Sequence, residues 1–160
     1  MSPTVGTHVP EVTAEAYVPG AREPQPIAVP ASDGGWTALV FYPGDFTCVC
    51  PTELQGFAEL QDEFAAEGAT LLAASSDSFY AHKAWFESQP LLARARFSVL
   101  ADTSRALRRA FGVLGERGMF LIDPDGILRH ATADVCPAET LRTLRTLRWR
   151  SEPAALSVAA

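Results

Sequence analysis

The chain has 160 residues, a formal net charge of −6 at pH 7 and 48% hydrophobic residues, which suffices for one domain with a buried core. This acidic balance gives no reason to expect a nucleic-acid partner. No apolar run approaches the roughly 20 residues that span a membrane, so we expect no membrane partner. The N-terminus lacks a basic start followed by an apolar core, and the three cysteines are an odd number. We therefore expect a cytoplasmic protein without a structural disulfide framework.

Strands and helices are predicted to alternate along the chain. The first 35 residues are rich in Pro, Gly and Ala and form an irregular lead-in. Short apolar runs and turn residues predict strands at 11–17, 26–29, 36–42, 70–74, 97–101, 119–122 and 127–132. Helices are predicted at 51–67, from Asp77 or Ser78 to before Pro90, at 103–111 and at 138–149. The turn signal Asp123-Pro-Asp-Gly126 makes the last two strands a hairpin. This order predicts an α/β protein with a thioredoxin-like fold, in which helices flank a central mixed sheet.

No domain boundary appears along the chain. We expect residues 1–150 to form a single domain and residues 151–160 to form a loose tail. Within the last predicted helix, Leu141, Leu144 and Leu147 recur every third residue and are expected to pack inward.

The strongest chemical signal lies where strand 36–42 gives way to the next helix. Pro51 suits the first helical position, so Cys50 should lie at or within one turn of a helix N-terminus. Such a terminus stabilises an anion and can lower a thiol pKa from about 8.5 to roughly 3.5–7.5. The alternative is a buried, inert cysteine. Glu53 completes a capping-box pattern with Cys50, and its charge opposes a thiolate unless a cation compensates.

This segment carries a family resemblance. Phe41-Tyr-Pro-Gly-Asp-Phe-Thr-Cys-Val-Cys-Pro-Thr-Glu-Leu54 resembles the peroxidatic-cysteine motif of the peroxiredoxins, and looks closest to the alkyl hydroperoxide reductase C and typical two-cysteine branch. Further stretches agree in order: His82–Trp85, Leu100–Arg105, Phe111–Leu114, Arg117–Asp123 and Gly126–Arg129. The resemblance extends over nearly the whole chain. It implies the thioredoxin-like fold and an antioxidant, thiol-dependent peroxidase that reduces hydrogen peroxide and small organic hydroperoxides.

The resemblance also implies roles for particular residues. Cys50 would be the peroxidatic nucleophile that becomes a sulfenic acid. Arg117 would stabilise the thiolate and the developing oxyanion, with Glu53 holding its guanidinium in place. Thr47 would offer a hydroxyl to the peroxide, and Pro43 would shield the pocket from water. Without the resemblance, Arg117 is interpreted as a surface charge, Thr47 as a turn residue and Pro43 as a strand terminator.

The fate of the sulfenic acid depends on a second thiol. Typical two-cysteine members place a resolving cysteine after the last helix, in a Val-Cys-Pro sequence. In this chain Cys136 has the same Val-Cys-Pro context but lies before the last helix. In a thioredoxin-like sheet it would follow an edge strand about two strand spacings, or roughly 10 Å, from Cys50. A disulfide needs a Cα separation of about 4.4–6.8 Å, so local unwinding would be required. Either Cys136 resolves Cys50, or it is a cap or core residue and an external thiol does so.

Cys48 leaves further alternatives open. The family usually carries an aromatic residue there, and a disulfide between Cys48 and Cys50 would be strained. A thiol–disulfide oxidoreductase using Cys48 and Cys50 as its pair is one competing class. A non-enzymatic holdase of the same fold is another, for which Cys50 would be dispensable. No Cys or His spacing suits a metal, and we expect neither a metal nor a cofactor.

The expected partners are a peroxide, a thioredoxin-type or other thiol reductant, and a second copy of the chain in a homodimer. Only Gly115 and Glu116 separate Leu114 from Arg117, where the family normally has a longer loop. Members of the family often form dimers and rings of dimers, and this short loop, together with the absent C-terminal arm, puts that assembly in doubt, though not the active site. His82 is expected on a helix that packs against the sheet or a neighbouring subunit.

Overall fold

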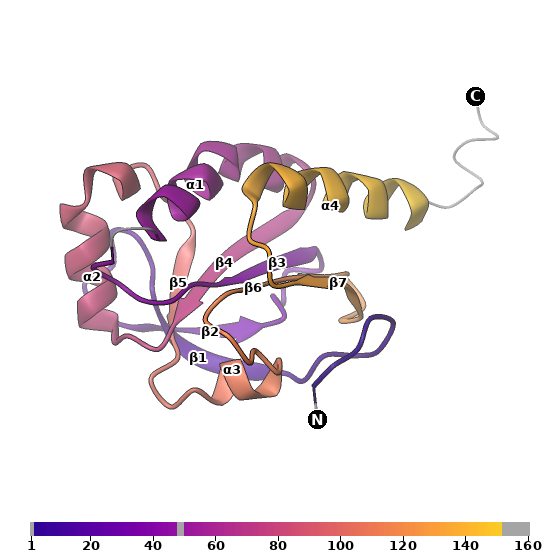
Figure 1. Cartoon of the computed structure of the whole chain (residues 1–160), viewed down its shortest axis with the longest axis horizontal. Helices are drawn as coiled ribbons and strands as arrows, with labels where there is room; N and C mark the ends of the chain where they lie inside the picture. The colour runs from indigo at the N-terminus through magenta and orange to yellow at the C-terminus, as the bar shows by residue number, and fades with distance from the viewer. Residues whose placement is uncertain (1, 48–49, 152–160) are drawn as a thin grey trace.

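A computed structural model describes residues 2–47 and 50–151, and for Cys50 only the backbone. Its framework is a seven-stranded sheet with the strand order β2-β1-β5-β4-β3-β6-β7 (Figure 1). The strands are β1 Val12–Tyr17, β2 Gln25–Val29, β3 Trp36–Phe41, β4 Ala69–Ser75, β5 Ser98–Ala101, β6 Gly118–Ile122 and β7 Leu128–Thr132. The three strands β3, β4 and β5 run parallel, and the outer pairs are antiparallel. The predicted mixed sheet is confirmed.

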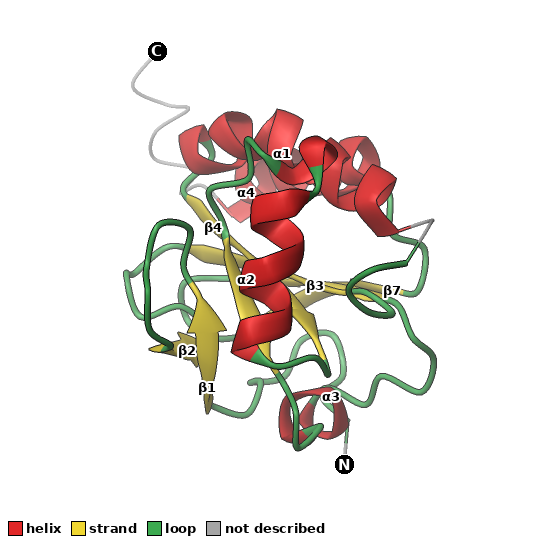
Figure 2. Cartoon of the chain, turned by 90° about the vertical axis from the view of Figure 1, so that its left-hand side faces the viewer, coloured by secondary structure: helices red, strands yellow, loops and turns green. Residues whose placement is uncertain are grey.

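Helices cover both faces of this sheet. They are α1 Cys50–Ala66, α2 Phe79–Ser88, the 3₁₀ turn η1 Pro90–Leu92, α3 Ala106–Ala110 and α4 Pro137–Ser151. Helices α1 and α4 lie side by side above the sheet, α2 crosses its left end, and α3 lies below (Figures 1 and 2). Among the described residues, no helix is long and apolar enough to cross a membrane.

The central strand β3 explains how the layers hold together. All six of its residues are buried, as expected for a strand covered on both faces. Because side chains alternate between the faces of a strand, Ala38 and Val40 join the core under α1 and α4. Leu39 and Phe41 join the second core, which packs against α3. The chain leaves the C-terminal end of this rigid strand to reach Cys50.

The predicted start of helix 103–111 is wrong, because α3 begins only at Ala106. Arg105 has a left-handed φ of 62°, which interrupts the helix before this point. The buried Asp102 carboxylate accepts hydrogen bonds from the backbone N–H groups of Leu107 (2.9 Å) and Arg108 (2.8 Å). These bonds satisfy amides in the first turn of α3, so the helix starts where Asp102 can cap it.

Other expectations are confirmed by the structure. The β6–β7 hairpin forms around a turn in which Gly126 has a φ of +81°. Leu141 and Leu144 of α4 are buried, and Leu147 packs against the same core. Ser78 caps α2, whose His82 is fully buried beneath the helix. The predicted end of the last helix at residue 149 is too early, because α4 extends to Ser151, the first residue of the predicted tail. Residues 152–160 lie outside the described residues.

Candidate active site

The candidate site lies where the loop after β3 reaches the N-terminus of α1. The helix begins at Cys50, as predicted, so this residue lies in the first turn, where backbone N–H groups and the helix dipole favour an anion. Cys48 lies outside the described residues, and so does the alternative in which Cys48 and Cys50 act as a pair. The rest of the site is built from the residues that surround this helix start.

Arg117 contacts the first turn of α1 through Glu53. The β3–β6 register pairs Phe41 with Gly118, which places Arg117 just before β6 at the end of β3. Its Nε donates to both carboxylate oxygens of Glu53, at 2.9 Å and 3.2 Å. Both side chains are partly buried, with 32% and 22% of their surfaces exposed. The structure thus brings together two predicted site residues that are 64 positions apart.

The geometry of this ion pair leaves most of the guanidinium available. An arginine has five N–H donors, and both contacts with Glu53 come from Nε. Among the described residues, no other acceptor receives a hydrogen bond from Arg117. Glu53 lies in the first turn of α1, so its partner Arg117 is held beside the head of this helix. Arg117 can therefore offer N–H groups to an anion near the head of the helix.

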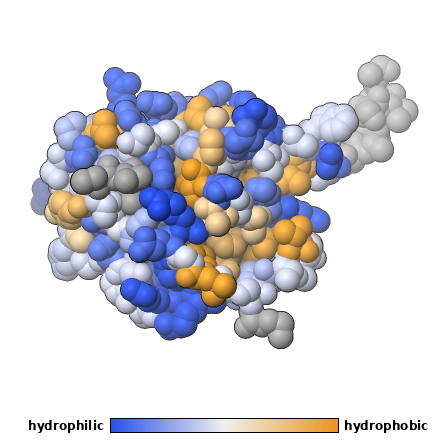
Figure 3. All heavy atoms as spheres, viewed as in Figure 1, coloured by the Kyte–Doolittle hydropathy of each residue, from blue (hydrophilic) through white to orange (hydrophobic). Residues whose placement is uncertain are grey.

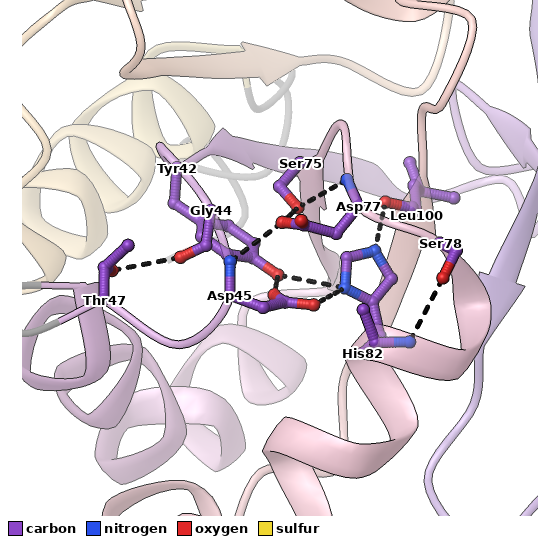
Figure 4. Close-up of polar contacts among 10 residues, drawn as sticks. Tyr42, Gly44, Asp45, Thr47, Ser75, Asp77, Ser78, His82 and Leu100 are labelled. Carbon is purple, nitrogen blue, oxygen red and sulfur yellow. Dashed lines mark hydrogen bonds and ion pairs between the residues drawn. The ribbon is translucent and has the colours of Figure 1, made fainter.

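The loop before α1 holds Pro43 and Thr47. The Thr47 hydroxyl donates to the carbonyl of Gly44 at 3.0 Å, and its oxygen keeps acceptor capacity (Figure 4). Pro43 is half-buried. Phe46 has a left-handed φ of 60°, a conformation that costs about 1–3 kcal/mol for a bulky residue. The loop therefore needs firm anchoring to keep its shape.

A buried polar network provides this anchor. Asp45 Oδ2 lies 2.7 Å from Nδ1 of His82, and both side chains are almost completely buried. The Tyr42 hydroxyl donates to Asp45 Oδ1 at 2.5 Å, and Nε2 of His82 lies 3.0 Å from the carbonyl oxygen of Leu100 (Figure 4). Burial, reinforced by the Asp45 charge, raises the pKa of Tyr42 well above its usual value. The network ties the loop to α2 and to β5.

A second carboxylate ties the same loop to the end of β4. The backbone N–H of Asp45 donates to Asp77 Oδ2 at 2.8 Å, and so does the hydroxyl of Ser75 at 2.8 Å. Sequence reasoning assigned no role to either aspartate. The signal was present, since Asp45 stands inside the cysteine motif and His82 inside a second matching stretch. Nothing in the sequence showed that Asp45 and His82, which are 37 positions apart, contact each other in the fold.

Cys136 lies exposed at the start of α4. Its carbonyl accepts the first helical hydrogen bond from the Thr140 N–H at 2.9 Å, which makes it the N-cap residue. Cys136 follows the edge strand β7, as predicted. Strand β7 runs parallel to β3, and the C-terminal ends of both strands lie at the same end of the sheet. Helix α1 approaches closely here, because a Cβ added at Gly56 would lie 2.8 Å from Pro137 Cγ.

An open groove borders Arg117 on the side away from α1. Its volume is about 610 Å³, and Phe111, Val113, Leu114 and Phe120 contribute to its lining. Leu114 is fully exposed. Apolar side chains gather over the middle of this face of the molecule, between α3 and α4 (Figure 3). The described residues contain no group of three or more His, Cys, Asp or Glu side chains arranged to bind a metal ion.

The chain has a thioredoxin-like fold, in which helices flank a mixed sheet and a cysteine begins the helix that follows β3. Residues 5–131 match the AhpC/TSA family. The chain belongs to this family, and the resemblance drawn from its motifs is confirmed.

Individual relatives cover most of the chain. It is 39% identical over 163 residues to the thioredoxin peroxidase of Echinococcus granulosus, which covers 93% of this chain and 83% of the relative. It is 34% identical over 124 residues to the alkyl hydroperoxide reductase C of Staphylococcus haemolyticus, covering 74% of this chain and 66% of the relative. The solved structure of Mycobacterium tuberculosis AhpC superimposes with a TM-score of 0.85 at 30% identity, covering 97% of this chain and 98% of that one. The protein is accordingly a thiol-dependent peroxidase.

Proposed function

We propose that the chain reduces hydrogen peroxide and small organic hydroperoxides through Cys50. The thiolate attacks one peroxide oxygen, the O–O bond breaks, and the departing oxygen takes a proton to leave as water or an alcohol. Cys50 becomes a sulfenic acid. The observation that carries this proposal is the Arg117–Glu53 pair at the head of α1.

The other site residues would act around this step. Arg117 stabilises the thiolate and the charge that develops on the departing oxygen. Glu53 orients the Arg117 guanidinium by pairing with it. The positive charge of Arg117 offsets the repulsion between the Glu53 carboxylate and the thiolate. Thr47 contacts the peroxide through its hydroxyl, and Pro43 limits the access of water to the site.

We propose further that Cys136 resolves the sulfenic acid. Its thiol attacks the Cys50 sulfur, and water leaves as the disulfide forms. The close approach of Pro137 to Gly56 supports this, because it places Cys136 beside α1. Gly56 lies six residues beyond Cys50, about 9 Å along the helix axis, so the first turns of α1 must unwind to close the gap. The alternative is resolution by an external thiol.

The reductant, assembly and compartment follow from this chemistry as proposals. A disulfide formed by Cys50 and Cys136 would be reduced by a thioredoxin-type donor through thiol–disulfide exchange. A thiol that must return to its reduced form at each turnover suits a reducing compartment such as the cytoplasm. We also propose a homodimer. A thiol–disulfide oxidoreductase based on Cys48 and Cys50, or a holdase, would lack a rapid reaction with peroxide.

Peptide mapping tests the proposed cycle directly. The reduced protein is treated with one equivalent of hydrogen peroxide, and intact mass and non-reducing peptide maps are compared with the untreated control. A Cys50–Cys136 linkage is the expected result. Oxidised Cys50 beside a free Cys136 would establish a one-cysteine cycle and overturn the role of Cys136. An unmodified Cys50 would overturn the peroxidase mechanism itself.

A further inference from the structure

The end of the β3–β6 ladder carries both halves of the proposed site. Phe41 pairs with Gly118, so the next residues outward, Tyr42 and Arg117, leave the sheet opposite each other. The chain beyond Tyr42 leads to Cys50, and Arg117 supplies the positive charge. The separation of thiolate and guanidinium therefore depends on how firmly this ladder end is held.

Arg108 reaches this ladder end from α3, on the opposite face of the sheet from α1. Its Nη1 donates to the carbonyl of Gly115 at 2.8 Å, and its Nη2 donates to the carbonyl of Tyr42 at 3.5 Å. Its Cζ lies 5.4 Å from the centre of the Phe41 ring, within the range of a cation–π interaction. One planar guanidinium thus bridges the loop before Arg117 and the strand end that leads to Cys50.

The backbone of Arg108 is held in place, and its guanidinium contacts a loop whose backbone receives few other hydrogen bonds. The backbone N–H of Arg108 donates to the buried Asp102 carboxylate at 2.8 Å, which fixes the start of the side chain. Burial lowers the pKa of Arg108, and Asp102 acts in the opposite direction. Within the described part of the chain, no other hydrogen bond reaches the backbone of residues 114–116.

We propose that Arg108 is a positioning residue, which sets the placement of Arg117 relative to Cys50 by clamping the carbonyls of Tyr42 and Gly115. This inference rests on the proposed function of Cys50 and Arg117. A lysine cannot replace it, because a compact ammonium on a flexible stem lacks the rigid fork that reaches both carbonyls.

The neighbouring arginine provides a matched control. Arg109 lies on the same helix and is exposed, and among the described residues its side chain donates only to the carbonyl of Ser104, at 2.9 Å. Replacing either arginine by alanine removes one charge from α3. Arg108→Ala is expected to slow the reaction of Cys50 with hydrogen peroxide by about 10- to 100-fold, since small misplacements of catalytic groups have effects of this size. Arg109→Ala should leave the rate within about twofold, as expected for an exposed surface change.

Two readouts separate positioning from a general loss of structure or charge. The pH–rate profile of Cys50 oxidation should move to higher pH in Arg108→Ala and stay in place in Arg109→Ala. Arg108→Lys should remain slow; recovery of the wild-type rate by lysine would show that charge alone matters and would overturn the proposal.

Hydrogen exchange keeps the inference separate from the peroxidase assignment. Faster amide exchange in Arg108→Ala should be confined to peptides covering residues 42–47 and 113–117, with Arg109→Ala matching wild type. Should Arg108→Ala fail to fold, Arg108→Gln carries the same measurements. An inert wild-type Cys50 would sink the proposed function, and exchange alone would then decide whether Arg108 holds the loops. Unchanged exchange and an unchanged rate would overturn the positioning role.

Discussion

Two helices of this protein start with nearly the same four-residue sequence, yet their surroundings in the fold differ. Helix α1 begins with Cys50 and α4 follows Cys136, and each cysteine precedes proline, one further residue and glutamate. Glu53 is partly buried and paired with Arg117 from another part of the fold. Glu139 is exposed and paired with Arg142 on its own helix. The same local sequence therefore starts both helices, but in α1 the arginine that pairs with the first-turn glutamate comes from another element of the fold.

The approach to the two helices differs as well. The loop before α1 is held by Asp45, which is buried against His82 and Tyr42. Cys136 follows an edge strand and is exposed. The exposed Cys136 suits the proposed second step, in which a thiol attacks the oxidised Cys50. The anchored loop before α1 suits the proposed first step, whose rate depends on the placement of the nucleophile.

The largest expected effect comes from removing each thiol in turn. Cys50→Ser should abolish peroxide reduction, because a serine hydroxyl cannot replace the thiolate that attacks the peroxide at the start of α1. Cys136→Ser should keep the first reaction with peroxide and lose turnover supported by a thioredoxin-type donor. Stopped-flow oxidation and a coupled turnover assay measure the two steps separately. Full turnover by Cys136→Ser would show that the second helix start plays no part in the cycle.

The two arginine partners should differ strongly in their effect on the rate. Arg117→Gln is expected to lower the second-order rate constant for hydrogen peroxide by about 10²–10³, the effect of losing one preorganised charge-stabilising group. Arg142→Gln is the matched control, since it breaks the equivalent exposed pair with Glu139. Similar rates in the two variants would contradict the assignment of the charge to Arg117.

The anchor of the first helix start should respond to alkaline pH. Tyr42→Phe removes a hydrogen bond to the buried Asp45 carboxylate and should lower the free energy of unfolding by about 1.5–3 kcal/mol near neutral pH. The folded pKa of Tyr42 is raised, so its contribution is full below the unfolded value of about 10 and is lost as pH rises above it. Urea denaturation between neutral pH and pH 11 should therefore show the two proteins converging. A gap that stayed constant would contradict this account.

The smallest expected effect lies where the far end of α1 meets α4. Burial alone would raise the pKa of Glu67, but hydrogen bonds from Arg145 and Arg148 outweigh it and lower the pKa. The stabilisation is present above the unfolded pKa of about 4.3 and is lost as pH falls toward the lowered folded value. Arg148→Gln should reduce stability by no more than about 1 kcal/mol at neutral pH. Acid titration of unfolding checks this, because the variant should lose less stability than wild type on acidification.

The sequence by itself determined much of the architecture. Short apolar runs bounded by turn residues placed the strands, and Pro51 and Ser78 marked helix starts within a residue or so of where they occur. These features are local, since periodicity and capping depend on neighbours within a turn or two. The family resemblance of residues 41–54 pointed to Cys50, and the family assignment is confirmed.

Only the tertiary structure decided what surrounds the cysteines. The left-handed Arg105 and the cap from Asp102 shortened α3, which residue preferences alone did not predict. Asp45 and His82 meet because strand order and helix packing bring distant segments together. The same applies to Arg108, whose contacts with two loops depend on the register of β3 against β6. Such contacts are long-range, and their partners are fixed only once the sheet has formed.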